Sequence, residues 1–251
     1  MEVWRFYGED GEFLDEDRTP EENAGPHLIV VDGFYQDPYL VRQAALAAEF
    51  RQYSPPLPEL VPNIADVPEH VFACKGKWLS TVLTTFRGVA VREPYIGFRH
   101  LNDDLRVQFE QLIEHRIDLA GWQSGGDNWN GAFHLRDAEH DLGTVHHHWR
   151  KGDTYPRGWS GVVYLSPDAP ASSGTSIWRN NRTQKLVAKM GNLYEYDEKS
   201  FECALIVLNR FNRLVLFREN VLHKAEKGFG ALDGRRLTQT FFFPIDLQAS
   251  T

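Results

Sequence analysis

The C-terminal half of the chain carries the strongest constraint on the fold, a series of short β-rich runs separated by turn residues. From Asn128 onward, eight such runs follow one another, interrupted by Gly, Pro, Asn and Asp. They are NGAFHLR, TVHHHWR, GWSGVVYLSP, GTSIWRN, LIVLNRF, NRLVLF, VLHKAEKG and RRLTQTFFF. Short strands at this spacing are typical of a two-sheet jelly roll, so we predict a barrel of that kind over residues 128–246.

The residues before the barrel are predicted to support it. HLIVVDGF is expected to be a buried strand of β-branched residues. In DPYLVRQAALAAEF, Asp37 and Pro38 suit the first positions of a short helix. A longer helix is expected over LNDDLRVQFEQLIEHRIDLAGW, with Asn102 or Asp103 as its cap and Gly121 near its end. Residues 54–70 hold five prolines and are expected to form an irregular surface loop.

All 251 residues are predicted to form a single domain, because 42% of them are hydrophobic and 25% are charged, enough to bury a full core. Within it we expect a partly extended arm over residues 1–26, which are rich in acidic residues, Gly and Pro. A supporting strand, helices and loop follow over 27–127, and the barrel core occupies 128–246. The predicted fold class is therefore mainly β with flanking helices.

Charge and cysteine content restrict the partners and the compartment. The net charge of -8, with no block of Lys and Arg, argues against nucleic acid or a membrane surface and favours a small-molecule or peptide partner. Cys74 and Cys203 form no C-x-x-C motif, which fits a reducing compartment. The acidic N-terminal segment lacks the features of a signal peptide. We therefore expect a cytoplasmic protein, whose oligomeric state the sequence leaves open.

The strongest chemical signal is the run T-V-H-H-H-W-R. Side chains alternate along a strand, so His146 and His148 are expected on one face and His147 on the other. His223 lies in ENVLHKAEKG, on a separate predicted strand that a jelly roll can bring alongside the first. His146, His148 and His223 are therefore predicted to hold one metal ion. The competing interpretation is a solvated histidine tract without a ligand role. Imidazole binds iron, zinc and copper alike, so the sequence does not select among these metals.

The chain from Gly131 to Phe243 resembles the iron(II)/2-oxoglutarate-dependent oxygenase superfamily, particularly its prolyl-hydroxylase-like branch. The similarity runs through VHHHW, GWSGVVYLSPDAPASSGTSIWR, NRLVLFRENVLHKAEKGFG and GRRLTQTFFF. VVDGFYQDPYLVRQAALAAEF resembles the lead-in of a bacterial and phage subgroup of this branch. The resemblance implies a double-stranded β-helix, a cupin-like barrel, with Fe(II) and 2-oxoglutarate as cofactors. It also implies an oxidoreductase that consumes O₂.

The family holds its iron with an H-x-D/E pair and a distal histidine. The resemblance places His146 at the first position and His223 at the distal one, but His148 occupies the carboxylate position. A third neutral imidazole removes one negative charge, so oxidised states of the metal become harder to reach. Three outcomes stay open: an active three-histidine iron enzyme, a zinc or copper site, or a binding-only relative. Asp153 would restore a carboxylate if the strand were bulged, although its surroundings favour a turn.

The family binds the distal carboxylate of 2-oxoglutarate with an arginine on the eighth barrel strand. The resemblance assigns this role to Arg236, with Arg235 as the alternative, and a guanidinium can hold a carboxylate through two parallel hydrogen bonds. Tyr164 and Thr238 are expected to add hydroxyl groups to the same site. The predicted function is a non-heme Fe(II), 2-oxoglutarate-dependent oxygenase with an unidentified substrate. The alternatives are a cupin-like three-histidine dioxygenase without 2-oxoglutarate and a non-catalytic metal-binding or scaffold relative.

Overall fold

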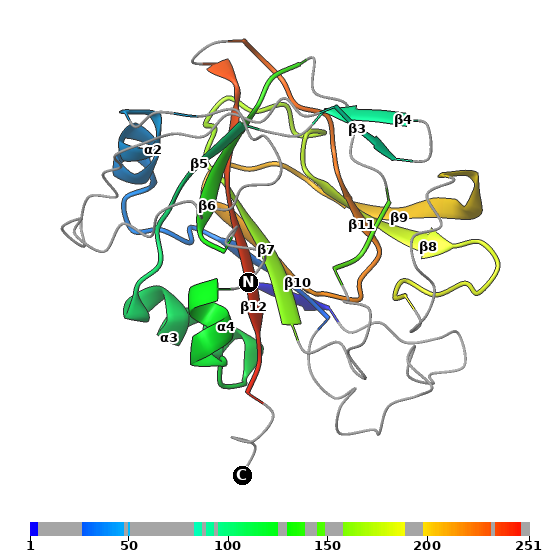
Figure 1. Ribbon diagram of the computed structural model, residues 1–251, viewed down its shortest axis with the longest axis horizontal. Coiled ribbons are helices and arrows are strands. Elements are labelled where there is room, and N and C mark those ends of the chain that lie inside the picture. The colour runs from blue at the N-terminus through cyan, green and yellow to red at the C-terminus, as the bar shows by residue number, and fades with distance from the viewer. Residues whose placement is uncertain are drawn as a thin grey trace.

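The computed structural model is mainly β-sheet with few helices (Figure 1). It describes residues 1–4, 27–47, 50, 83–86, 89–92, 95–124, 130–138, 145–148, 158–188, 198–231 and 234–246. Of the expected arm over residues 1–26, only residues 1–4 are described, and Glu2–Trp4 form a strand there. The proline-rich segment 54–70 lies outside the described residues entirely. No helix in the described part of the chain is long and apolar enough to cross a membrane.

A seven-stranded antiparallel sheet forms the centre of the molecule, in the order β1-β2-β10-β7-β12-β6-β5. Its strands are β1 (Glu2–Trp4), β2 (Leu28–Asp32), β5 (Tyr95–Arg99), β6 (Ala132–Arg136), β7 (Gly158–Tyr164), β10 (Arg213–Arg218) and β12 (Arg236–Pro244). The expected buried strand in HLIVVDGF is confirmed as β2, which pairs with β10.

A three-stranded sheet in the order β11-β8-β9 lies to one side of the larger sheet (Figure 1). It contains β8 (Thr175–Asn180), β9 (Phe201–Val207), which follows the short 3₁₀ turn η2 (Glu198–Ser200), and β11 (His223–Ala225). β3 (Leu83–Phe86) and β4 (Val89–Arg92) form a separate pair. The sheets are open, so they do not confirm a closed jelly-roll barrel.

Alternation along β12 divides the larger sheet into two faces, because successive side chains on a strand point in opposite directions. Leu237, Phe241 and Phe243 belong to the main hydrophobic core, which also contains Phe109 and Trp122 of the helices. The intervening residues of β12 line a cavity on the opposite face, and they are Arg236, Thr238, Thr240 and Phe242. One strand therefore contributes both to the core and to the candidate site.

Two helices stand where the sequence predicts one long helix between residues 101 and 122, and that prediction is wrong. α3 (Asp103–Ile113) begins at its cap Asn102, whose side chain accepts a hydrogen bond from the Leu105 amide at 2.8 Å. The helix ends because Glu114 adopts the left-handed conformation with φ of 59°, which cannot continue an α-helix. α4 (Leu119–Ser124) follows, with Gly121 inside it packed closely against Pro244 of β12.

The helix predicted after the first buried strand is confirmed as α2 (Pro38–Ala47). Its first turn is capped by Asp37, whose carboxylate accepts a hydrogen bond from the Leu40 amide at 3.0 Å. Val41, Ala44 and Ala45 are buried at the helical spacing that the sequence shows. The helix therefore covers the core face of the larger sheet, opposite the face that bears the cavity.

Candidate metal centre

The segment that carries two of the predicted ligands, residues 145–148, is not a strand, so that expectation for TVHHHWR is wrong. His146 forms an isolated antiparallel bridge with His223, and each amide donates to the other's carbonyl at 2.9 Å. The His148 amide donates to the carbonyl of Glu219 at 2.7 Å. These backbone hydrogen bonds hold His146 beside β11 and His148 beside the turn between β10 and β11. His147 is buried and does not line the cavity, as the predicted alternation requires.

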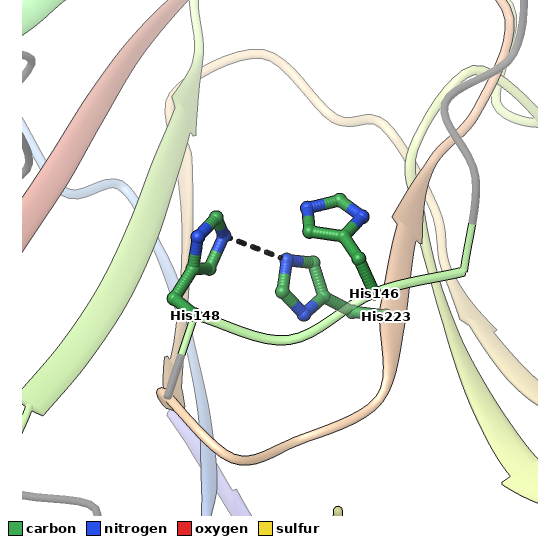
Figure 2. A group of neighbouring side chains, drawn as sticks. All are labelled: His146, His148 and His223. Atoms are coloured by element: carbon green, nitrogen blue, oxygen red, sulfur yellow. Dashed lines mark hydrogen bonds between the residues drawn. The ribbon is translucent and has the colours of Figure 1, made fainter. Parts of the chain in front are cut away.

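The three predicted ligands converge on one point (Figure 2). One ligand nitrogen from each of His146, His148 and His223 lies within 4.8 Å of the others. The Nε2 atoms of His148 and His223 are 3.1 Å apart. A metal–nitrogen bond of about 2.0–2.1 Å with ligand angles near 90–109° separates two nitrogens by roughly 2.9–3.4 Å. The spacing of these two imidazoles therefore fits a shared first-row metal ion.

The imidazole of His223 is held in the orientation that a ligand needs. Its Nδ1 donates to the carbonyl of Val221 at 2.8 Å, which leaves the lone pair of Nε2 directed at His148. Burial lowers the pKa of His223 well below its ordinary value, the charges of His146 and His148 act in the same direction, and the hydrogen bond to Val221 opposes them. The ring is therefore neutral near neutral pH, as metal binding requires.

A cavity of about 150 Å³ opens between the two sheets beside this cluster. All three histidines reach it, and among the described residues that line it there is no carboxylate. Asp153, the residue considered as a substitute carboxylate, lies outside the described residues. The wall comprises His134, Arg136, His146, His148, Ser160, Gly161, Val162, Thr175, Phe217, His223, Ala225, Arg236, Thr238, Thr240 and Phe242.

The predicted cosubstrate arginine, Arg236, is buried in this wall. Its guanidinium donates to the carbonyl of Glu226 at 2.9 Å and to the carbonyl of Gly174 at 3.1 Å. The Nε atom has no hydrogen-bond partner among the described residues. Burial lowers the pKa of Arg236, while Tyr164 and Glu226 oppose that shift. Arg235, the alternative, is half-buried and does not line the cavity.

Gly174 allows the contact that fixes Arg236. A Cβ atom at this position would lie 1.9 Å from the carbonyl oxygen of Val207, so no other residue fits without a shift of backbone. The Gly174 carbonyl accepts a hydrogen bond from the Glu226 amide at 3.0 Å as well as the one from Arg236. The guanidinium is therefore anchored by backbone groups of two segments.

Tyr164 and Thr238, the two predicted hydroxyl contributors, lie near Arg236 in different ways. The Tyr164 hydroxyl shares a 2.7 Å hydrogen bond with Thr175, and the Arg236 guanidinium lies 5.7 Å from the centre of the Tyr164 ring. Thr238 lines the cavity directly and pairs with Tyr164 across the β12–β7 ladder. Burial raises the pKa of Tyr164, with Arg236 and Thr175 acting against it, so its hydroxyl stays protonated.

Five polar residues of the cavity wall were not predicted as site residues from the sequence: His134, Arg136, Ser160, Thr175 and Thr240. Thr240 shares a 2.7 Å hydrogen bond with the Nε2 atom of His134. The signal that reveals two of them is alternation, since Ser160 stands four residues before Tyr164 on β7 and Thr240 two residues after Thr238 on β12. A residue that lies an even number of positions from a known site residue on the same strand points to the same face of the sheet.

The stability of the metal-free protein is expected to fall as the pH drops below about 6.5. Burial lowers the pKa of His134 to about 3, with Arg136 acting in the same direction, and burial lowers the pKa of His100 to about 3. Below pH 6.5 the unfolded chain binds protons at these sites and the folded chain does not. Each histidine then removes roughly 1.4 kcal/mol per pH unit until the folded pKa is reached.

Thermal unfolding between pH 7 and pH 5 measures this dependence. The His134→Gln variant, which cannot take up the proton, should show a shallower decline than the unsubstituted protein. Equal slopes for the two proteins would contradict the assignment of the effect to His134.

No protein-family model and no curated protein matches the sequence significantly. Solved structures similar to this chain include HygX from Streptomyces hygroscopicus with nickel, 2-oxoglutarate and hygromycin B bound, at 12% identity and a TM-score of 0.48 over 88% of this chain and 84% of that one. A prolyl hydroxylase from Trichoplax adhaerens, in complex with a hypoxia inducible factor peptide fragment, has 12% identity and a TM-score of 0.43 over the same shares of the chains. A Pseudomonas putida prolyl-4-hydroxylase has 15% identity and a TM-score of 0.39 over 88% of this chain and 94% of that one.

Proposed function

We propose that this chain is a non-heme Fe(II), 2-oxoglutarate-dependent oxygenase with a three-histidine metal site, acting on a small-molecule or peptide substrate. One observation carries the proposal: a single cavity is lined by three convergent imidazoles and by a buried arginine whose Nε lacks a partner among the described residues. Arg236 donates to the carbonyl of Glu226, which lies three residues beyond His223, so one stretch of chain runs from a metal ligand to the arginine. The proposed keto acid would bind the metal at one end and this arginine at the other.

The residues of the cavity fit both absent groups. Imidazole is a ligand that suits Fe(II), and three imidazoles leave coordination positions open for a keto acid and O₂. The buried guanidinium supplies the positive charge that a carboxylate needs when it leaves water. Phe217 lies tilted against the ring of His223 and Phe242 lies edge-on to the ring of His148, with ring centres 4.2 and 4.9 Å apart, and they exclude water from the metal end.

Bound Fe(II) supplies the redox chemistry with O₂ that no side chain of this cavity provides. In the proposed reaction, 2-oxoglutarate loses CO₂ and becomes succinate by taking one oxygen atom, while the other oxygen enters a C–H bond of the substrate. The chain's own part is to hold the metal through neutral imidazoles and to orient the cosubstrate through Arg236 and Thr238. Tyr164 does not line the cavity, and its part is to support Arg236 and Thr175 from behind the wall. These groups are fixed before the ligand arrives, so little ordering accompanies binding.

The proposal also covers the barrel fold of the chain and its location in the cell. We propose a double-stranded β-helix over residues 128–246, because two antiparallel sheets face each other across the cavity. Residues 27–127 would pack against it within a single domain. The cytoplasmic location stays a prediction from the cysteine content and the N-terminal composition.

Anaerobic reconstitution tests the function. Protein purified without an affinity tag and loaded with Fe(II) is expected to bind 2-oxoglutarate and to couple its decarboxylation to O₂ uptake, and protein stripped with a chelator is expected to do neither. If the Fe(II) protein neither binds 2-oxoglutarate nor decarboxylates it, the proposal fails. Oxidation of a substrate without any keto acid would favour the cupin-like three-histidine dioxygenase instead.

The His148→Asp variant is expected to retain the metal and to decarboxylate 2-oxoglutarate faster than the unsubstituted protein. The aspartate creates a two-histidine, one-carboxylate ligand set and returns the negative charge that makes oxidised metal states easier to reach. Metal content and the rate of O₂-dependent CO₂ release measure the result. His148→Asn is the matched control, since it has the same shape without the charge, and a rate for Asp no higher than for Asn would contradict the prediction.

A further inference from the structure

Ser160 lines the cavity and lies beside the metal-ligand cluster. On the larger sheet it stands between Phe217 of β10 and Phe242 of β12, which are its register partners on either side. Opposite residues on antiparallel strands have Cβ atoms about 4.5–5.5 Å apart, so the Ser160 side chain lies next to both rings. Those two rings are the ones that contact His223 and His148.

The hydroxyl of Ser160 has no hydrogen-bond partner among the described residues, although the residue is only 1% exposed. A buried hydroxyl without a partner loses its hydrogen bonds to water and gains nothing in exchange. Two other hydroxyls of the wall behave differently, since Thr175 is bonded to Tyr164 and Thr240 to His134. Ser160 therefore carries an unused donor that faces the cavity.

A second unsatisfied donor, the Nε of Arg236, lines the same cavity. Ser160 lies beside the two phenylalanines that contact the histidines. Its register partner on β12 is Phe242, and Arg236 lies six residues before Phe242 on the same strand. The cavity thus presents one unsatisfied donor near the metal ligands and one near the opposite end. A dicarboxylate carries one acceptor group for each of these two donors.

We propose that Ser160 is a positioning residue whose hydroxyl donates a hydrogen bond to the metal-proximal carboxylate of the keto acid. The inference rests on the proposed use of 2-oxoglutarate and adds a residue that orients its reacting end. With three neutral imidazoles as ligands, that carboxylate is the anionic group nearest the metal, so a donor placed beside it stabilises it. Arg236 would hold the other carboxylate.

Binding measurements on the Ni(II)-loaded protein test the inference without turnover. The dissociation constants of 2-oxoglutarate and of 2-oxobutanoate, which lacks the distal carboxylate, are measured by calorimetry for the unsubstituted protein and for Ser160→Ala. Loss of a hydrogen bond to a charged group is expected to weaken both ligands by roughly tenfold or more. Arg236→Met is expected to weaken 2-oxoglutarate alone, because 2-oxobutanoate has no group for the arginine.

Ser176→Ala is the matched control, because Ser176 is also buried on a strand but accepts a hydrogen bond from Trp178 at 2.7 Å and does not line the cavity. It is expected to lower the melting temperature and to leave both dissociation constants unchanged. Ser160→Ala is expected to raise both dissociation constants and to leave the melting temperature unchanged, since removing an unsatisfied buried hydroxyl does not destabilise the metal-free protein.

The possible outcomes separate the two proposals. If the unsubstituted protein binds neither ligand, the proposed function fails, and the role of Ser160 fails with it. If the unsubstituted protein binds both ligands and Ser160→Ala binds them equally well, only the role of Ser160 is overturned. A drop in melting temperature for Ser160→Ala with unchanged binding would likewise assign the hydroxyl a structural role.

Discussion

Replacing His223 with alanine is expected to abolish high-affinity metal binding. His223 is the most buried of the three ligands, and its backbone bridge to His146 and its Nδ1 hydrogen bond to Val221 fix it before the metal arrives. Removing a group that merely orients a ligand typically weakens metal binding by about 10–100-fold, so loss of the ligand itself should cost roughly a hundredfold or more. Equilibrium titration with Fe(II) under anaerobic conditions, and with Co(II) in air, measures the affinity.

The control for this variant is His115→Ala, because His115 follows α3 and does not line the cavity. Its metal affinity should equal that of the unsubstituted protein. Because His223 is buried, its loss also removes packing against Phe217, so His148→Ala provides a second test at a half-buried ligand. Full metal affinity in both folded ligand variants would refute the three-histidine site and would favour the interpretation as a scaffold.

Replacing Arg236 with methionine is expected to eliminate 2-oxoglutarate binding while leaving metal binding intact. Methionine fills a similar volume but removes the positive charge and every donor that a carboxylate would use. Hydrogen bonds to charged groups each contribute about 1.5–3 kcal/mol, so losing a two-bond contact should weaken 2-oxoglutarate by roughly a hundredfold or more. The carbonyls of Glu226 and Gly174 also lose the hydrogen bonds that Arg236 donates to them, so the variant is expected to melt at a lower temperature.

Calorimetric titration of the Ni(II)-loaded variant with 2-oxoglutarate measures this effect. Arg236→Lys keeps the charge without the planar pair of donors, and an intermediate affinity is expected for it. Arg235→Met is the matched control, because Arg235 precedes Arg236 on the chain and does not line the cavity. If Arg235→Met abolishes binding and Arg236→Met does not, the assignment of the cosubstrate arginine is reversed.

Local patterns predicted most of the strands and one helix. The alternation in RRLTQTFFF places Leu237, Phe241 and Phe243 on the core face of β12 and Arg236, Thr238 and Thr240 on the cavity face, and this pattern needs no knowledge of the rest of the chain. The first helix follows from Asp37, Pro38 and the spacing of its apolar residues. These features depend on neighbours within one or two turns of chain.

The errors arose where distant contacts override local preference. Helical spacing continues past Ile113, yet Glu114 turns the chain into the left-handed conformation and α4 packs Gly121 against Pro244 of β12. The histidine run alternates like a strand, but His146 pairs with a single residue of β11 and His148 bonds to the carbonyl of Glu219. In both cases the partner that decides the backbone lies far away in the sequence.

The residue types of the candidate site can be read from the sequence: three histidines in two segments, an arginine near the C-terminus and a histidine where the resembled family has a carboxylate. The folded chain is needed to see that the three imidazoles converge, that Arg236 and not Arg235 lines the cavity, and that Ser160 lies beside them with an unsatisfied hydroxyl. The physical reason is that ligand geometry, burial and hydrogen-bond satisfaction depend on distances through space. Segments as far apart in the chain as Ser160 and His223 acquire such distances only when β7, β10 and β11 pack together.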